Sequence, residues 1–427
     1  MTGNASVCEA FISNPFQYSL ADFYLGESRD PLIPPQDFTT WLRAAAPAIS
    51  LYEPKLHGAA TPRVRMYFDG GFRSVINFAS YNYLGLSIHP DTIAAAQAAL
   101  PEYGTGAGGS PISYGVTDLH AKFEEELTSF LGADSTIVYT SGYVAALATL
   151  QAVLRRGDVA IADSKMHISA LDGVHLAQAK LATFDHNEPQ SLAQCLDRHK
   201  NKRRLVLLQG LYPADGDLPR LPELLKVAES HGVGVLLDEA HSILTCGPRG
   251  AGTAEHFGVS DRIGLSYASL SKSFAALGGS VSGSRNLIDY VRMYGHGYGF
   301  STALPAPVIA SLRAALKVAQ TGADLREKLW SNGRYLRAKL NELGVDTGYS
   351  SSFIVPIMIG ADRKLLYDLC HKMRRRGLLL PPIDYPVVPQ DQVRFRALVT
   401  TMHTREDLDE ALTIIEDTVV RAIGKRI

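Results

Sequence analysis

The sequence predicts an α/β protein whose large domain has a mostly parallel sheet with helices on both faces, followed by a smaller C-terminal α+β domain. Three observations lead to this prediction. The chain has 427 residues, too many for one simple core. Between residues 74 and 305, short apolar runs alternate with helical stretches, which is typical of parallel strands buried on both faces. After residue 305, two helices precede two strands that flank further helical patterns.

We divide the chain into an N-terminal segment (1–73), a large domain (74–305) and a small domain (306–427). The N-terminal segment contains one helical pattern, PQDFTTWLRAAAPA. The large domain begins with a strand that ends in a turn, SVINFASYNYLGL. A helix is predicted at 120–132, and the apolar runs that predict the following strands cover residues 135–140, 159–163, 204–210, 232–240 and 262–270.

The small domain is predicted to begin with two helices, at 306–322 and 326–344. The second helix is amphipathic and ends at a glycine, as many helices do. Two strands follow, SFIVPIMIG and QVRFRALVTT, and each precedes a helical pattern. This mixture of segregated helices and strands defines the predicted α+β domain.

Composition and charge exclude several classes of protein. The formal net charge is −1 and no long basic run occurs, which argues against nucleic acid as a partner. No apolar stretch of about 18 residues is present, so we expect no membrane span. The N-terminus lacks the pattern of a signal peptide, so we expect a cytoplasmic protein. Four cysteines lie far apart, which predicts free thiols rather than disulfides or a metal site: Cys8, Cys195, Cys246 and Cys370.

Ligands in an open parallel sheet bind beyond the carboxyl ends of the strands, so the residues there are the candidates for chemistry. The strand at 135–140 leads into Ser141-Gly142-Tyr143 at the start of a helix, where backbone N–H groups suit an anion. Taken alone, an ordinary strand-to-helix turn explains that segment as well. The next two candidates are Asp238, a buried acid that needs a cationic partner, and Lys272, in ASLSKSFAALGGS.

Together, the anion site, the acid and the lysine fit pyridoxal 5′-phosphate (PLP). This cofactor needs a lysine for a Schiff base, a carboxylate at its pyridine nitrogen and an anchor for its phosphate. A metal site is a weaker interpretation, because Asp238, Glu239 and His241 lack a second cluster of ligands. A P-loop is excluded, since no GxxxxGK[ST] occurs, and the glycines of GTGAGGS lack the preceding strand of a nicotinamide site.

The residues resemble the α-oxoamine synthases, a branch of the fold-type I PLP-dependent transferases that includes 8-amino-7-oxononanoate synthase, 5-aminolevulinate synthase and serine palmitoyltransferase. The resemblance covers roughly residues 74 to 420. It rests on nine segments in family order: NFASYNYLGL, GTGAGGS with FEEELTSFLG, SGYVAAL, HISALDG, DGDLPRLPEL, LDEAHS with GPRG, SLSKSFAALGGSVSG, FSTALP, and YPVVP with VRFRALVTTMHT. Nine such segments in order are a specific signal.

The resemblance implies a role for each candidate around the cofactor ring. Lys272 would form the Schiff base and later remove the Cα proton of the substrate, and Asp238 would pair with the pyridinium nitrogen. His241 would bind the phenolic oxygen, and His167 would stack on the ring; without the motif, His167 is a plain core histidine. The groups implied for the phosphate are the backbone of Ser141, Gly142 and Tyr143 and the hydroxyl of Ser269.

Four further residues are implied at the substrate and at a neighbouring subunit. Arg396 would clamp the carboxylate of the amino acid, a task that suits a guanidinium fork, although the pattern alone also fits a surface arginine. Asn82 would lie near the cofactor and that carboxylate. Ser301 and Thr302 would reach the phosphate of the neighbouring subunit, which implies a homodimer with shared active sites.

The implied reaction is a decarboxylative Claisen-type condensation. A small amino acid reacts with an acyl thioester, carried by CoA or by an acyl carrier protein, and gives an α-amino ketone, CO₂ and a free thiol. Another PLP reaction on the same fold is an alternative: aminotransfer, aldol cleavage or decarboxylation. A non-catalytic subunit is a third, but that interpretation expects loss of Lys272, Asp238 or His241, and all three are present.

Four positions depart from the family's usual residues. Pro213 stands where a serine is common, Leu244 where a glycine is common, Pro111 where an arginine or glycine is common, and Phe353 where a small residue is common. These differences predict an atypical amino-acid or acyl substrate.

Overall fold

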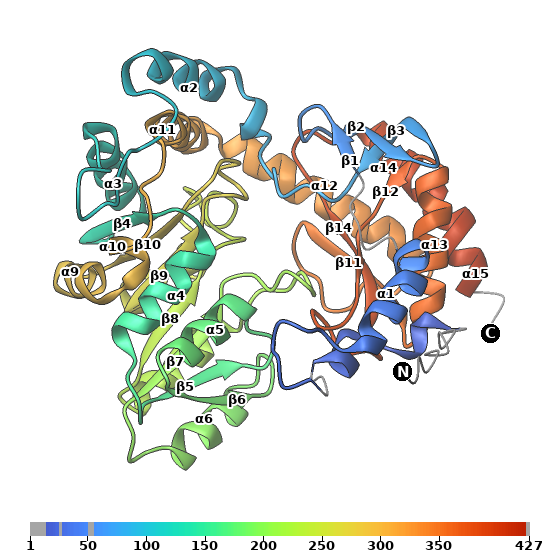
Figure 1. Cartoon of the computed structure of the whole chain (residues 1–427). Helices are drawn as coiled ribbons and strands as arrows, with labels where there is room; N and C mark the ends of the chain where they lie inside the picture. Colours follow the sequence, from blue (N-terminus) through green and yellow to red (C-terminus); the bar gives the residue numbers. More distant parts are fainter. Residues whose placement is uncertain (1–13, 25–27, 50–54, 424–427) are drawn as a thin grey trace, which may run out of the picture.

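The computed structural model describes residues 14–24, 28–49 and 55–423. A seven-stranded sheet forms the centre of the larger half (Figure 1). Its strands run across the sheet in the order β4-β10-β9-β8-β7-β5-β6. Their bounds are β4 (Ser135–Tyr139), β5 (Val159–Asp163), β6 (Lys180–Phe184), β7 (Arg204–Gln209), β8 (Gly234–Asp238), β9 (Leu265–Ser269) and β10 (Gly279–Gly283).

The five strands predicted for this sheet are confirmed, and β6 and β10 are additions. Every neighbouring pair is parallel except those of β10, which pairs antiparallel with both β4 and β9. The sequence of β10 is GSVSG, which lacks the apolar run that marks a strand, because two glycines and two serines occupy it. β6 is an edge strand with mostly exposed or half-buried residues, so it also lacks a continuous apolar run.

Helices cover both faces of this sheet, as predicted. Ala160 and Leu207 face one core, with α4, α5 and α9, whereas their neighbours Ile161 and Val206 face another, with α6 and α7. The helices of this half are α2 (Pro90–Tyr103), α3 (Asp118–Leu131), α4 (Gly142–Val153), α5 (Ile168–Leu176), α6 (Pro189–Arg198), α7 (Leu221–Ser230), α8 (Thr253–His256), α9 (Arg285–Tyr294), α10 (His296–Gly299) and α11 (Ala306–Thr321), with 3₁₀ turns η3 (Leu86–Ile88) and η4 (Ser260–Arg262).

The smaller half is the predicted α+β domain. Its three-stranded sheet has the order β11-β14-β13, with all pairs antiparallel. The elements are α12 (Ala323–Glu342), β11 (Ile354–Gly360), α13 (Arg363–Arg375), β12 (Leu378–Leu379), β13 (Pro382–Ile383), β14 (Val393–Leu398) and α14 (Arg405–Ile415), which continues through a π-helical turn, η5 (Glu416–Val420), into α15 (Arg421–Ile423).

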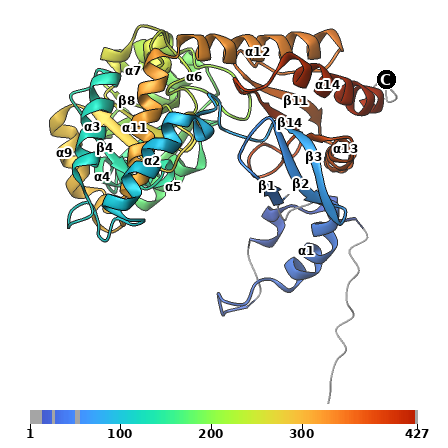
Figure 2. The same ribbon diagram turned by 90° about the horizontal axis from the view of Figure 1, so that it is seen from above.

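A group of three strands and one helix associate across the predicted domain boundaries. The strands β1 (Lys55–His57), β2 (Arg63–Phe68) and β3 (Gly71–Asn77) form a sheet with β12, so they belong beside the small domain, as Figure 2 shows. In the other direction, α11 packs on α2 and α3 of the large domain. Short-range pattern cannot reveal either association, because both partners are far apart in the chain. The three-part division itself stays a prediction.

The described part of the N-terminal segment packs on α13. It contains η1 (Pro15–Gln17), η2 (Leu20–Phe23) and the predicted helix, α1 (Gln36–Ile49). Trp41 of α1 is buried and donates its indole N–H to the carbonyl of Pro15 at 3.0 Å. Arg363 of α13 donates to the carbonyls of Phe16 and Tyr18, which ties the segment to the small domain.

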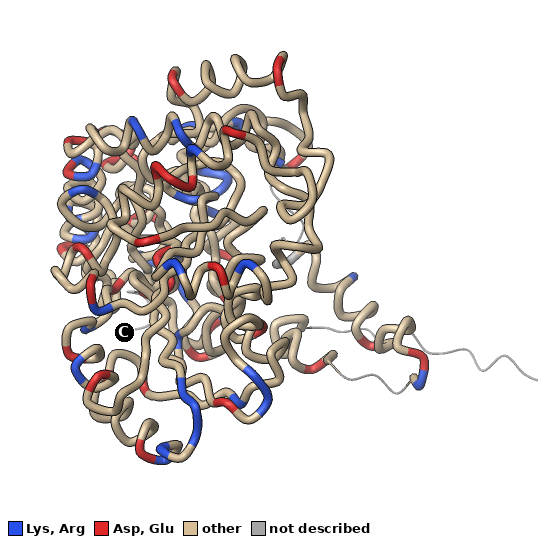
Figure 3. Tube along the Cα trace, turned by 90° about the vertical axis from the view of Figure 1, so that its left-hand side faces the viewer, with Lys and Arg blue, Asp and Glu red and all other residues tan. Residues whose placement is uncertain are grey.

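Further features of the described residues concern membrane spans, metal ligands and cysteines. None of their helices is long and apolar enough to cross a membrane. They contain no group of three or more histidine, cysteine or acidic side chains that could hold a metal ion. Cys195, Cys246 and Cys370 are free and buried, while Cys8 lies outside the described residues. Basic and acidic side chains are interspersed along the trace in Figure 3.

Candidate active site

The carboxyl ends of β4, β8 and β9 meet around a cavity of about 230 Å³. This volume is near the lower end of ligand pockets, so it suits one small cofactor. Most of the predicted cofactor residues line it. The full lining is Ser141, Gly142, Tyr143, His167, Ser169, Gln209, Asp238, Ala240, His241, Tyr267, Ser269, Ser271 and Lys272.

Lys272 follows β9 and lines the cavity. Its amine lies 5.9 Å from the ring centre of Tyr81, and no carboxylate of the described residues pairs with it. Burial lowers the pKa of Lys272; the charge of Asp238 opposes this effect, and the charge of Arg396 adds to it. A lysine with a lowered pKa is more often neutral, which a nucleophile or general base requires.

Asp238 ends β8 and is 4% exposed. One carboxylate oxygen accepts the backbone N–H of Ala240 at 2.8 Å, and the other accepts the hydroxyl of Tyr267 at 2.7 Å. Tyr267 lies on β9, directly opposite Asp238 in the strand register. These two donors fix the carboxylate without neutralising its charge, so the charge is available to a cationic group in the cavity.

Two histidines complete the surroundings of Lys272. Burial lowers the pKa of His241 well below its usual range, with further lowering by Lys272 and Arg396, so its ring is neutral. Its Nδ1 lies 2.8 Å from the hydroxyl of the buried Tyr83. His167 caps α5, and its Nδ1 accepts the backbone N–H of Ser169 at 3.2 Å. That bond holds the imidazole against the cavity.

The start of α4 forms the anion site. Ser141 is the N-cap, and its hydroxyl accepts the N–H of Val144 at 3.2 Å. The first amides of a helix have no acceptor within the helix, so those of Gly142 and Tyr143 suit a phosphate. A Cβ on Gly142 would lie 2.5 Å from the Cβ of Ser269, so only glycine lets the helix approach β9 this closely. Gly279 similarly leaves room for the backbone of Ser141.

The small domain contributes Arg396, which is 9% exposed on β14. Its guanidinium donates to the hydroxyl of Tyr81 at 2.6 Å and to the carbonyl of Pro213 at 3.2 Å. Its Nε has no hydrogen-bond partner among the described residues. The guanidinium carbon also lies 5.4 Å from the ring centre of Tyr81, so this ring contacts both Arg396 and Lys272.

Sequence reasoning missed Tyr81. It precedes the predicted Asn82 in SYNYLGL, and the structure turns the two side chains to different partners. The amide of Asn82 is buried and donates to the hydroxyl of Ser87 at 2.7 Å, which stabilises the turn. A role of Asn82 at the substrate stays a prediction. An aromatic residue next to a predicted site residue was the only signal that could have suggested Tyr81.

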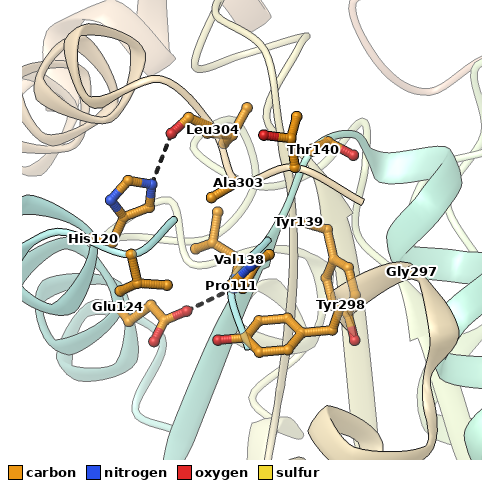
Figure 4. A pocket seen from close by; sticks show the side chains of 12 residues that line it. Pro111, His120, Glu124, Val138, Tyr139, Thr140, Gly297, Tyr298, Ala303 and Leu304 are labelled. Atoms are coloured by element: carbon orange, nitrogen blue, oxygen red, sulfur yellow. Dashed lines mark hydrogen bonds between the residues drawn. The ribbon is translucent and has the colours of Figure 1, made fainter. Parts of the chain in front are cut away.

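Ser301 and Thr302 do not line the cavity of this chain. Thr302 donates to the carbonyl of Gly109 at 3.2 Å, beside a void of only about 10 Å³ behind β4 (Figure 4). That void has room for about one water, so it is no substrate site. His120 contacts the carbonyl of Leu304 at 2.9 Å, which holds the segment in place. The contact of Ser301 and Thr302 with a neighbouring subunit stays a prediction.

None of the four unusual residues lines the cavity. The carbonyl of Pro213 accepts from Arg396, and Phe353 is buried against Tyr83 and Trp330. Pro111 lines the small void behind β4. The expectation of an atypical substrate, which rested on these residues, has no direct contact to support it.

Leu244 is unusual in its backbone rather than at the site. It has φ +65°, a left-handed conformation in which glycine is common, and its side chain is fully buried in the main core. The buried leucine side chain offsets the backbone strain, because such strain costs about 1–2 kcal/mol and burial of a leucine contributes about 2–3 kcal/mol.

The turn that contains Pro213 is anchored by a half-buried histidine. His186 lies 2.9 Å from Asp163 and 2.9 Å from Asp217. Burial alone would lower the pKa of His186, but hydrogen bonds and charge from the two carboxylates raise it to about 9. A protonated imidazole thus holds two acids together beside the cavity.

Replacing His186 by glutamine is expected to destabilise the protein in a pH-dependent way. Because the pKa of His186 is higher in the folded protein than the 6.5 of the free group, its stabilisation is complete below pH 6.5 and is lost as the pH rises through about 9. A shift of this size corresponds to about 3 kcal/mol. Urea unfolding of both proteins between pH 6 and pH 10 measures the effect. A difference that is constant across this range, or that the exposed His175→Gln control reproduces, would contradict it.

Comparisons with known proteins identify the family. Residues 73–415 match the family described as aminotransferase class I and II. The 8-amino-7-oxononanoate synthase of Thermoanaerobacter pseudethanolicus is 36% identical over 82% of this chain and 89% of its own length. The chain belongs to the α-oxoamine synthases.

Two further α-oxoamine synthases agree with this assignment. The 4-hydroxy-2,2′-bipyrrole-5-methanol synthase PigH of a Serratia species is 38% identical over 81% of this chain but only 53% of its own length. A lysine-to-alanine variant of serine palmitoyltransferase from S. paucimobilis, whose structure was solved with a bound PLP–myriocin aldimine, superposes with a TM-score of 0.85. It is 29% identical and covers 91% of this chain and 98% of its own.

The family assignment confirms three predictions from the sequence. This α-oxoamine synthase has the fold of the type I PLP enzymes, its cofactor is PLP, and it is an acyl-transferring enzyme of the decarboxylative condensation class. The cavity fits that cofactor. The amide cradle at α4 suits the phosphate, the fixed charge of Asp238 suits the pyridinium, and the unpaired amine of Lys272 suits the aldehyde.

Proposed function

We propose that this α-oxoamine synthase condenses a small amino acid with an acyl thioester, carried by CoA or an acyl carrier protein. The observation that carries the proposal is the position of Arg396. A buried guanidinium from the small domain and the amine of Lys272 contact the same ring, that of Tyr81. An amino acid bound between them would pair its carboxylate with Arg396 while its α-carbon lies beside Lys272.

Each residue around the cavity has a separate role in the proposed reaction. Bound PLP supplies an electron sink for negative charge at the α-carbon. The amine of Lys272, made less basic by burial, takes the proton from that carbon. Asp238 holds a positive charge at the pyridine nitrogen, and the neutral His241 donates or accepts at the phenolic oxygen without adding charge. His167 lines the cavity and would stack on the cofactor ring.

Release of a thiol and CO₂ tests this function. Glycine, alanine and serine are each mixed with the holoenzyme and with an acyl-CoA or an acyl carrier protein donor, and thiol and CO₂ are measured together. Equal amounts of both products support the condensation. Accumulation of pyridoxamine phosphate with a keto acid, without thiol release, would instead show aminotransfer.

Replacing Arg396 by methionine is expected to raise the KM for the amino acid about 100-fold, because a charge-assisted, bidentate contact to the carboxylate is lost. The KM for the thioester is expected to change little. Steady-state kinetics with each substrate varied in turn measures the two values, with Arg334→Met, an exposed arginine, as the matched control. An equal rise in KM for both substrates would show that Arg396 does not bind the amino acid specifically.

We also propose that the enzyme is a cytoplasmic, biosynthetic homodimer with shared active sites. Support comes from the three described cysteines, which are free, and from Ser301 and Thr302, which lie outside their own cavity. Mixing Lys272→Ala with Thr302→Ala subunits tests the sharing. Recovery of activity in the mixture is expected only if each cavity receives Thr302 from a partner.

A further inference from the structure

One turn of the large domain, residues 212–217, is held by the small domain through its carbonyl groups. The carbonyl of Pro213 accepts from Arg396, and that of Ala214 accepts from Arg394 at 3.4 Å. The carbonyl of Gly216 accepts the hydroxyl of Ser352 at 2.7 Å. This turn is therefore a joint between the domain that carries Lys272 and the strand that carries Arg396.

Asp215 is the residue of this joint that forms an ion pair with the small domain. It is 7% exposed, and one carboxylate oxygen lies 2.8 Å from Arg394 and 2.8 Å from Lys165. Burial would raise the pKa of Asp215, but Lys165 and Arg394 together lower it below its usual value. Arg394 is only 2% exposed, so its charge depends on Asp215 for compensation.

Arg394 and Arg396 are two residues apart on β14, so their side chains leave the same face of the strand. Both point to the 212–217 turn. Both edges of β14 are paired: Arg394 lies opposite Met358 of β11 and opposite Ile383 of β13. A contact that fixes Arg394 therefore fixes the position from which the guanidinium of Arg396 reaches Tyr81.

The turn itself has little freedom to follow a shift of β14. Gly216 has φ +73°, and a Cβ at this position would collide with the carbonyl of Ile354, so only glycine fits. Asp217 is held from the large domain by His186 and by the side-chain amide of Asn187, each at 2.9 Å. Asp215 thus links Arg394 to a rigid part of the large domain.

We infer that Asp215 is a positioning residue: through Arg394 it holds the guanidinium of Arg396 where the carboxylate of the amino acid binds. It sets the affinity for the amino acid and leaves the binding of the acyl thioester unchanged. This inference rests on the proposed function only in its assumption that an amino acid binds at Arg396.

Spectral titration of the PLP-loaded enzyme with amino acids tests the inference without requiring turnover. Asp215→Asn is expected to raise the Kd of the best-binding amino acid about tenfold, since a displacement of about 1 Å is enough to lose an oriented contact. Asp197→Asn, which changes an exposed acid on α6, is the control variant, and its thermal midpoint is compared with that of Asp215→Asn. In separate turnover assays, the KM of Asp215→Asn for the thioester is expected to stay unchanged. An unchanged Kd for Asp215→Asn would overturn the inference.

A double variant keeps the test decisive if the single variant folds poorly. Asp215→Asn with Arg394→Gln removes both buried charges, so neither is left unpaired. If Asp215 acts through Arg394, the double variant raises the Kd of the amino acid about as much as either change alone. If the fold-increases in Kd of the two single variants multiply in the double variant, the two residues act independently and the inference is overturned. A wild-type enzyme that binds amino acids but releases no thiol would refute the proposed condensation and leave the role of Asp215 open to the same titration.

Discussion

Replacing Lys272 by alanine is expected to lower turnover by at least about 10³-fold and to remove the visible absorption band of lysine-bound PLP. The physical reason is that one amine has two tasks, the covalent bond to the cofactor and the transfer of the Cα proton. Among the residues that the structure describes, no second lysine lines the cavity to replace it. Absorption spectra and thiol release on the same preparation measure both losses.

Two further variants separate the tasks of Lys272 from its charge. Lys272→Arg keeps the positive charge but cannot form a Schiff base at neutral pH, because the pKa of a guanidinium is above 12. It is expected to behave like the alanine variant. Lys226→Ala, at an exposed position on α7, is the control and should keep the band. A band that survives Lys272→Ala would show that PLP is attached elsewhere.

Replacing Asp238 by asparagine is expected to lower turnover by about 10²–10³-fold while PLP remains bound. The amide oxygen can still accept from Ala240, and the NH2 group can donate to the hydroxyl oxygen of Tyr267, so the local structure is preserved. The amide carries no charge, however, to hold a proton on the pyridine nitrogen. The ring then accepts negative charge less readily. Single-turnover loss of the Cα proton, followed by exchange with deuterated solvent, measures this step directly.

The same variant has a second, independent effect. The charge of Asp238 raises the pKa of Lys272 against the lowering by burial. Its removal is therefore expected to shift the pH midpoint of PLP attachment to lower pH. Tyr267→Phe removes one donor to Asp238 but leaves the charge, so it should shift neither this midpoint nor turnover by a comparable amount. Unchanged turnover in Asp238→Asn would show that Asp238 does not pair with the pyridine nitrogen of the cofactor.

Much of the site could be predicted because its residues follow directly from buried strands. Asp238 and Ser141 come at strand ends, Lys272 follows shortly after, and the ends of parallel strands share one edge of a sheet. Cofactor residues in such a fold therefore lie in sequence beside the most visible elements. Their physical setting, a buried lysine with a lowered pKa near a fixed carboxylate, agrees with that expectation.

Other features depended on contacts between distant segments. β10 is stabilised by pairing with two neighbours and not by its own residues, so its sequence shows no strand pattern. The pairing of β3 with β12 joins residues about 300 positions apart. Tyr81 and Asn82 are adjacent and both polar, and only the fold of the turn decides that Tyr81 contacts the site while Asn82 donates to Ser87.

The sequence by itself determined the cofactor of this α-oxoamine synthase, and it predicted a lysine, an acid and an anion cradle that line one cavity of the structure. These depend on residue type and on short stretches of chain, which local order preserves. The tertiary structure decided what lies on the substrate side, because it brings Arg396 of the small domain to the Tyr81 ring that also faces Lys272. That placement depends on the buried contact between Arg394 and Asp215, two residues far apart in the chain. Only folding brings such a pair together, so no local pattern could have revealed it.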